Sequence, residues 1–239
     1  MAAIAVPRPF ADARRDLGFT GRVEKRVLTW LALRLPLWVN SDHLTALGLL
    51  AMLAAGGAYW RSGADATWLH AVNALLVVNW FGDSLDGTLA RVRARCRPRY
   101  GFYVDHMVDM FGVLFLSGGL ALSGLMSPVV AVAVLIAYYL LSINVYLATY
   151  TLGVFKISFG GLGGTELRLL VMAGNLLVIQ KSHLPLLGRQ ILVYDLVGVV
   201  MAVAMAAALV FATVRNTVAL YRLEPLAPMD VPATGGAVG

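Results

Sequence analysis

The sequence has few charged residues and almost no cysteine. Only 13% of its 239 residues are charged, whereas about a quarter are charged in an ordinary water-soluble domain. Together with a mean hydropathy of +0.77, this scarcity excludes a conventional soluble domain. The single cysteine, Cys96, excludes an internal disulfide and a structural metal site built from cysteines.

Long apolar runs are abundant, and a helix of about 20 such residues crosses a bilayer. The first 21 residues lack an apolar run, so we expect no cleaved signal peptide. Six runs follow, at approximately 43–60, 68–90, 101–122, 128–151, 166–180 and 191–214, and the fifth is the shortest. We therefore predict an all-α integral membrane protein whose six transmembrane helices form one catalytic domain over residues 40–222.

An amphipathic segment, residues 22–39, precedes the first run. Its apolar side chains fall mostly on one helical face and its basic side chains on the other: Val23, Val27, Trp30 and Leu31 against Arg22, Lys25 and Arg26. This pattern is typical of a helix that lies in the headgroup layer. The alternative, a longer first span, is disfavoured because Arg34 and Pro36 interrupt it.

The basic residues predict the orientation of the chain. Sixteen of the 19 Lys and Arg residues fall on the side of both termini and of the loop after the second run, and three fall on the other. Because cytosolic loops are enriched in Lys and Arg, both termini are expected in the cytosol. Residues 1–21 would form a cytosolic segment, and the Pro- and Gly-rich residues 223–239 a disordered tail. The net charge of +6 then reflects topology and anionic headgroups rather than nucleic acid.

Four of the 13 acidic residues lie in one short stretch. Asp83 and Asp86 are three residues apart near the end of the second run, and Asp105 and Asp109 are four apart in the first turns of the third. With a loop of about nine residues between the runs, both pairs should face each other at one level. Four carboxylates there repel one another unless a cation lies among them. We predict a site for one or two hard divalent cations, Mg²⁺ or Mn²⁺, which typically bind substrate phosphates.

Nearby residues also suit a phosphate ligand. Gly87 and Gly101 would let a ligand approach the backbone, and Arg91 offers a planar fork of donors. The alternative is an inert network of these aspartates with the loop arginines. It is disfavoured because Asp105 and Asp109 would point into the membrane, where acidic residues usually serve a function.

The spacing Asp83-x2-Asp86-Gly87-x2-Ala90-Arg91-x9-Gly101-x3-Asp105-x3-Asp109 resembles the signature of the CDP-alcohol phosphotransferase family at all eight positions. The resemblance implies a phospholipid-synthesising enzyme in the bilayer, active at the cytosolic leaflet and homodimeric. It would transfer a substituted phosphate from a CDP-alcohol to an acceptor hydroxyl, release CMP and require Mg²⁺ or Mn²⁺. The implied metal ligands are Asp83, Asp86 and Asp105, with Asp109 as ligand, general base or both. The implied CDP site contains Gly87, Ala90, Arg91 and Gly101.

The acceptor is less well defined by the sequence. His106, which follows Asp105, resembles the choline and ethanolamine phosphotransferase branch, which acts on diacylglycerol, and it could be a base or a packing residue. The compact chain is more similar to bacterial members that use CDP-diacylglycerol, the donor we favour. A phosphorylated acceptor would need further cations, which Lys156 and Arg168 could supply. The alternative for the stretch around Arg168 is a loop that ends in a helix cap at Thr165.

Two other classes of membrane protein are alternatives to this one. A cation transporter should place its acidic residues near the bilayer midplane, often in two related halves, whereas these aspartates cluster at one face. Prenyltransferases of the UbiA type also hold Mg²⁺ with paired aspartate motifs, but those motifs lie far apart in a longer chain. Cation transport remains the alternative of a different class.

Overall fold

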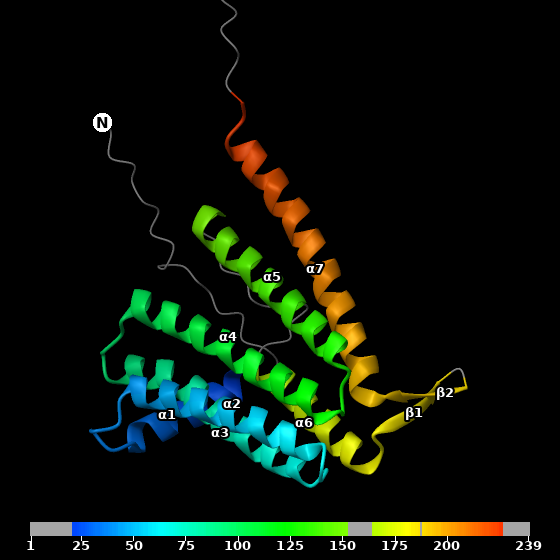
Figure 1. The fold of residues 1–239 in the computed structure, drawn as a ribbon. Coiled ribbons are helices and arrows are strands. Elements are labelled where there is room, and N and C mark those ends of the chain that lie inside the picture. Colours follow the sequence, from blue (N-terminus) through cyan, green and yellow to red (C-terminus); the bar gives the residue numbers. More distant parts are fainter. Residues whose placement is uncertain (1–20, 153–163, 187, 227–239) are drawn as a thin grey trace, which may run out of the picture.

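The computed structural model describes residues 21–152, 164–186 and 188–226 (Figure 1). Its elements, in chain order, are α1 (Gly21–Arg34), α2 (Ser41–Ser62), α3 (Trp68–Val92), α4 (Pro98–Ser123), α5 (Pro128–Leu152), α6 (Gly164–Gln180), β1 (His183–Leu186), β2 (Arg189–Leu192) and α7 (Val193–Leu223). The predominantly helical prediction is confirmed. The antiparallel β1–β2 hairpin was not predicted, and it shortens the sixth run because α7 begins only at Val193. The N-terminal 20 residues and the tail from 227 onward lie outside the described residues.

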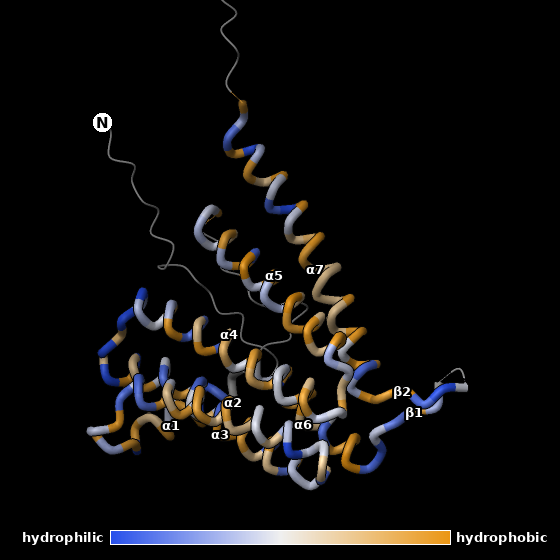
Figure 2. Tube along the Cα trace, in the orientation of Figure 1, coloured by the Kyte–Doolittle hydropathy of each residue, from blue (hydrophilic) through white to orange (hydrophobic). Residues whose placement is uncertain are grey.

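Each predicted apolar run corresponds to a helix, α2 to α7. Within the described ranges, four helices are long and apolar enough to cross a membrane: α2, α4, α5 and α7. Helix α6 has only 17 residues, and α3 carries several polar side chains, among them Asn73 and Asn79. Hydrophobic residues cover much of α5 and α7, whereas hydrophilic residues gather where α3 connects to α4 (Figure 2). The chain is therefore an integral membrane protein, and the count of six spans stays a prediction.

Helix α2 lies at the centre of the packing, because it contacts both α3 and α4 extensively. Glycines make both crossings close. A Cβ atom at Gly82 of α3 would lie 2.5 Å from the carbonyl oxygen of Leu44, and one at Gly119 of α4 would overlap the carbonyl oxygen of Gly56. Small residues of this kind let membrane helices approach backbone to backbone. The two helices that carry the aspartates are thus held mainly through α2.

A buried polar network joins α2, α3, α6 and α7 at the other end of α3. The hydroxyls of Tyr59 and Tyr194 donate to Asn175 Oδ1 at 2.7 and 2.5 Å, and Asn175 Nδ2 donates to Asn73 Oδ1 at 2.6 Å. Asn175 is completely buried. Since Asp83 is ten residues beyond Asn73, this network lies about 15 Å along α3 from the aspartates. It fixes the bundle without entering their site.

Helix α1 packs on the bundle mainly through residues other than those of the predicted apolar face. Leu28 and Ala32 are buried against a cluster from α2 and α3 that includes Leu85. Val27 and Trp30, of the predicted apolar face, are 43% and 53% exposed. The helix also ends at Arg34, five residues before the predicted end at 39, because the approaching Pro36 disfavours helical backbone before it. Its location in the headgroup layer stays a prediction.

The connection between α3 and α4 is shorter than the sequence suggested. Helix α4 begins at Pro98, a residue favoured in a first turn, so the loop holds only residues 93–97 and Gly101 is already helical. The Arg93 guanidinium donates to the Leu35 and Pro36 carbonyls at 2.9 and 3.0 Å, and also to those of Leu37 and Val39. This arginine therefore attaches the loop to the linker between α1 and α2.

Candidate active site

Asp86 is oriented by the first turns of α2. Its Oδ2 accepts a hydrogen bond from Thr45 Oγ1 at 2.6 Å, and its carbonyl oxygen accepts one from Ser41 Oγ at 3.0 Å. The backbone N–H of Gly87 donates to Asp86 Oδ1. Both carboxylate oxygens are therefore engaged, and the half-buried side chain is held in one orientation.

Asp83 forms a partly buried ion pair with α6. Arg168 Nη2 lies 2.6 Å from Asp83 Oδ2, and these side chains are 18% and 26% exposed. Arg168 Nε also donates to Asn79 Oδ1 at 2.8 Å, and Asn79 Nδ2 donates to the Gly48 carbonyl at 3.1 Å. The planar guanidinium thus joins α6 to α3, and Asn79 joins α3 to α2.

Asp83 does not pair with an arginine of the loop, as the alternative of an inert network would require. The partner of Asp83 comes from α6, as described above. Arg97, in the loop, instead forms an ion pair with Asp42 near the start of α2. Arg91 Nη2 donates to Thr88 Oγ1 at 3.1 Å on its own helix.

The two aspartate pairs approach each other across α3 and α4. The charges of Asp83 and Asp105 both act on Asp86. The charge of Asp109, one turn further along α4, acts on Tyr138 and Tyr146 of α5. Asp86 and Asp105 therefore lie within electrostatic range of each other, and Asp109 lies within the same range of α5.

The donor set suits a hard cation, because it consists of carboxylate oxygens with a hydroxyl beside them. Among the described residues, however, no group of three or more His, Cys, Asp or Glu side chains is close enough to form a preassembled metal site. The predicted metal ligands thus have the right chemistry without forming a preassembled cluster among the described residues, and metal binding stays a prediction.

His106 lies between aromatic side chains of α4 and α5. Its Nδ1 is 2.6 Å from the carbonyl oxygen of Phe102, and its ring centroid is 4.2 Å from that of Phe102 and 4.9 Å from that of Tyr146. Since a carbonyl only accepts, Nδ1 donates the proton in this contact. The imidazole is therefore oriented by packing, which favours the packing alternative, and its role as a base stays a prediction.

The remaining signature residues follow Asp86 on α3 or begin α4. The guanidinium of Arg91 lies over Gly87, where an added Cβ would be 3.5 Å from Arg91 Nη1. Gly101 is exposed in the first turns of α4. Lys156, the other predicted cation, lies outside the described residues.

A cavity of about 390 Å³ opens beside Ala90 at this end of the bundle. This volume falls within the range of small-molecule sites, about 300–1,000 Å³. The lining comes from the start of α2, the end of α3 and the loop after it: Asn40, Ser41, Asp42, Leu89, Ala90, Arg93, Arg95, Cys96 and Arg97. The cavity therefore adjoins the segment that orients Asp86 and is bordered by arginines.

Two supporting residues were missed by the sequence analysis. Thr45 lies in the first turns of α2, whose N-cap is Asn40 in a capping box with His43. The structure adds the hydrogen bond from Thr45 to Asp86. Asn79 precedes Asp83 by four residues, so the shared helical face could have indicated it. No sequence pattern indicated the pairing of Asp83 with Arg168.

Comparison with known families agrees with the signature. Residues 38–219 match the family model described as CDP-alcohol phosphatidyltransferase. The match includes α2 to α6 and most of α7, and therefore every aspartate of the site. No curated protein matches the chain. Because the matched residues make up well over half of the sequence, the chain belongs to the CDP-alcohol phosphatidyltransferase family.

Proposed function

We propose that this family member transfers a phosphatidyl group from CDP-diacylglycerol to the hydroxyl of a phosphorylated acceptor, releases CMP and depends on a divalent cation. The family match supports a phospholipid-synthesising transferase that uses a CDP-alcohol in a membrane. One observation carries the proposal of a phosphorylated acceptor and a divalent cation. A cationic side chain, Arg168, lies against Asp83, while Asp83 and Asp105 lie within electrostatic range of Asp86.

Asp83, Asp86 and Asp105 would hold Mg²⁺ or Mn²⁺. Asp109 would act as a further ligand, as the general base, or as both. When bound, the cation would neutralise the diphosphate of the donor and make CMP a better leaving group. Thr45 and Ser41 would keep Asp86 in the orientation that binding requires, since both contact it from α2.

The protein groups would position the two substrates. The nucleotide would bind next to the cavity beside Ala90, whose lining includes none of the four aspartates. The backbone at Gly87 and the side chain of Arg91 would lie next to the diphosphate. Arg168 would bind the acceptor phosphate through its planar donors, and this cation favours an anionic acceptor over diacylglycerol. Asp109 would accept the proton of the attacking hydroxyl, so that the new phosphorus–oxygen bond forms as the bond to CMP breaks.

The first test measures CMP release by the purified full-length protein in detergent, with Mg²⁺, Mn²⁺ or EDTA. The substrate panel pairs CDP-diacylglycerol with glycerol 3-phosphate, inositol phosphate, inositol or serine, and CDP-choline or CDP-ethanolamine with diacylglycerol. We expect metal-dependent release with one pair, reduced at least about 100-fold in Asp86→Asn. Asp65→Asn is the control, because Asp65 is exposed between α2 and α3. If the protein shows no turnover and no metal-dependent binding of a CDP-alcohol, the transferase is excluded and cation transport is favoured.

A second test concerns the hydroxyl of Thr45. Thr45→Val keeps the shape of the side chain and removes the donor to Asp86 Oδ2, so the affinity for Mg²⁺ should fall about 10- to 100-fold. The Mg²⁺ dependence of CMP release and calorimetric Mg²⁺ binding measure this change. Thr45→Ser retains the hydroxyl and should behave like the native protein. Equal Mg²⁺ affinity in Thr45→Val would show that this hydrogen bond does not support the metal site.

A further inference from the structure

Glu24 connects α1 to two helices of the site. Its Oε1 accepts hydrogen bonds from Trp80 Nε1 of α3 at 2.9 Å and from Thr165 Oγ1 of α6 at 3.0 Å. Glu24 lies before the residues that match the family model, which begin at 38. Glu24 is therefore outside the matched residues, whereas both of its donors, Trp80 and Thr165, are inside them.

The two donors lie next to the ion pair of the site. Thr165 precedes Arg168 by three residues on α6, and Trp80 precedes Asp83 by three residues on α3. Residues at this spacing share a helical face. Glu24 and the Asp83–Arg168 pair therefore link adjacent turns of α3 and α6.

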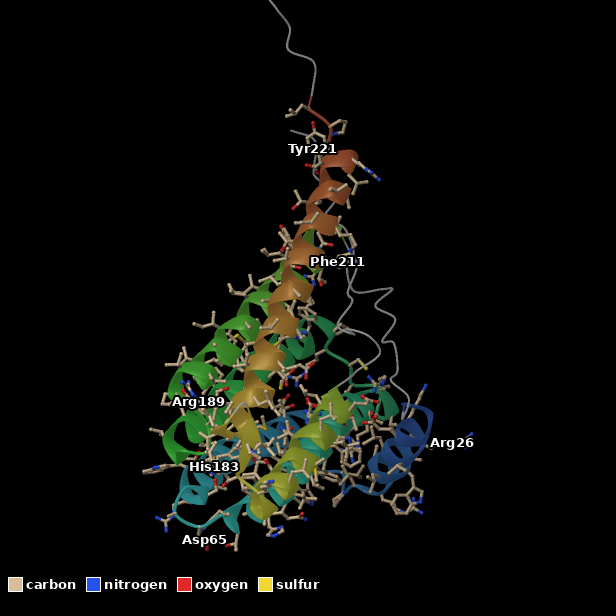
Figure 3. The ribbon with its side chains drawn as sticks, turned by 90° about the vertical axis from the view of Figure 1, so that its right-hand side faces the viewer. Arg26, Asp65, His183, Arg189, Phe211 and Tyr221 are labelled. Atoms are coloured by element: carbon tan, nitrogen blue, oxygen red, sulfur yellow. The ribbon has the colours of Figure 1, made fainter. Side chains whose placement is uncertain are left out.

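The position of Glu24 is fixed by the packing of α1. Leu28, one turn further along, is buried against α3, so the Glu24 side chain is directed inward and is half-buried. Lys25 and Arg26 are exposed, and Figure 3 shows Arg26 at the outer edge of α1. A carboxylate held this way restrains α6 more effectively than a mobile surface side chain would, because little conformational entropy remains to be lost.

We propose that α1 is part of the active-site scaffold and that Glu24 is a positioning residue for Arg168. Through Thr165, Glu24 holds the first turn of α6 against α3, and so places the Arg168 guanidinium where an acceptor phosphate binds. This inference rests on the proposed function for the identity of that ligand. Loss of the Thr165 contact should weaken the acceptor interaction and spare the donor, because Thr165 lies on α6 whereas the donor's signature residues lie on α3 and α4. Loss of Glu24 removes the same contact together with the one to Trp80.

The test compares Glu24→Ala and Thr165→Val with Thr165→Ser, which retains the hydroxyl. Glu224→Ala is the matched control, since Glu224 is exposed just after α7. The first readout is hydrogen–deuterium exchange of the α6 amides in the purified full-length protein, which needs no turnover. We expect faster exchange over 164–172 in Glu24→Ala and Thr165→Val, and native exchange in Thr165→Ser and Glu224→Ala.

The second readout separates positioning from general loss of structure. With the phosphorylated acceptor that the CMP-release panel identifies, the KM for the acceptor should rise about 10- to 100-fold in Glu24→Ala and Thr165→Val. The KM for CDP-diacylglycerol and the thermal unfolding midpoint of Thr165→Val should stay close to native. Thr165→Ser should restore the acceptor KM.

Unchanged α6 exchange in both variants would overturn the proposal, and so would faster exchange with an unchanged acceptor KM. Equal rises in the KM of donor and acceptor would also overturn it, because they indicate a general disturbance of the site. If the native protein turns over no substrate pair, the proposed function fails by itself. The exchange experiment then still decides whether Glu24 positions α6.

Discussion

Replacing Asp109 by asparagine should lower the rate of CMP release about 10²- to 10⁴-fold while leaving the affinity for the CDP-alcohol nearly unchanged. Asparagine keeps the shape of aspartate but cannot accept the proton of the acceptor hydroxyl. Asp109 is half-buried on α4, four residues beyond Asp105, and its charge reaches the α5 tyrosines Tyr138 and Tyr146. Single-turnover CMP release and calorimetric binding of the donor separate the two effects.

His106→Gln is the matched comparison for this prediction. The imidazole is held by the Phe102 carbonyl and packs against Tyr146, so its replacement should reduce turnover far less than Asp109→Asn does. Full activity in Asp109→Asn would remove Asp109 from the role of base. Loss of turnover in His106→Gln together with intact donor binding would transfer that role to His106 and favour the choline or ethanolamine branch.

Replacing Gly119 by alanine should destabilise the protein by about 3 kcal/mol and abolish activity. An added Cβ would overlap the carbonyl oxygen of Gly56 on α2, and backbone atoms on both sides leave no flexible side chain that could move away. The helices would have to separate, which would displace Asp105 from Asp86. Thermal unfolding of the purified protein in detergent, monitored by circular dichroism, measures the loss of stability.

The neighbouring glycine provides the control. An added Cβ at Gly118 would meet nothing within 4 Å, so Gly118→Ala should leave stability unchanged or raise it by about 0.5–1 kcal/mol through helix propensity. On α2, Gly56 and Gly57 form the same kind of pair: a Cβ at Gly56 would overlap the Phe115 carbonyl, whereas Gly57 faces open space. Similar losses of stability at both members of a pair would contradict the close α2–α4 crossing.

Helix α7 illustrates how far composition alone predicts structure. This helix runs to Leu223, and Phe211 and Tyr221 in its later turns are 68% and 64% exposed (Figure 3). Its apolar sequence predicted a membrane-crossing helix, and the structure forms a helix that is long and apolar enough to cross one. The beginning of the helix was placed too early, because residues 191–192 are apolar enough for a span but pair in the β1–β2 hairpin.

The sequence by itself determined the helices, the membrane class and the family. Apolar runs specify helices locally, and the fixed spacing of Asp83, Asp86, Asp105 and Asp109 carries the family signature along the chain. These features depend on residues near one another, so they can be read from their order. The apolar runs also placed one aspartate pair shortly before the α3–α4 connection and the other shortly after it, where the structure has them.

Only the tertiary structure decided which side chains support the aspartates. Arg168 pairs with Asp83 across 85 residues, and Thr165 contacts Glu24 across 141. Such partners depend on how each helix is rotated and how closely it crosses its neighbours. Those quantities are set by the glycine contacts of α2 and by the packing of Leu28 on α1, because side chains far apart in sequence meet only after the helices have packed.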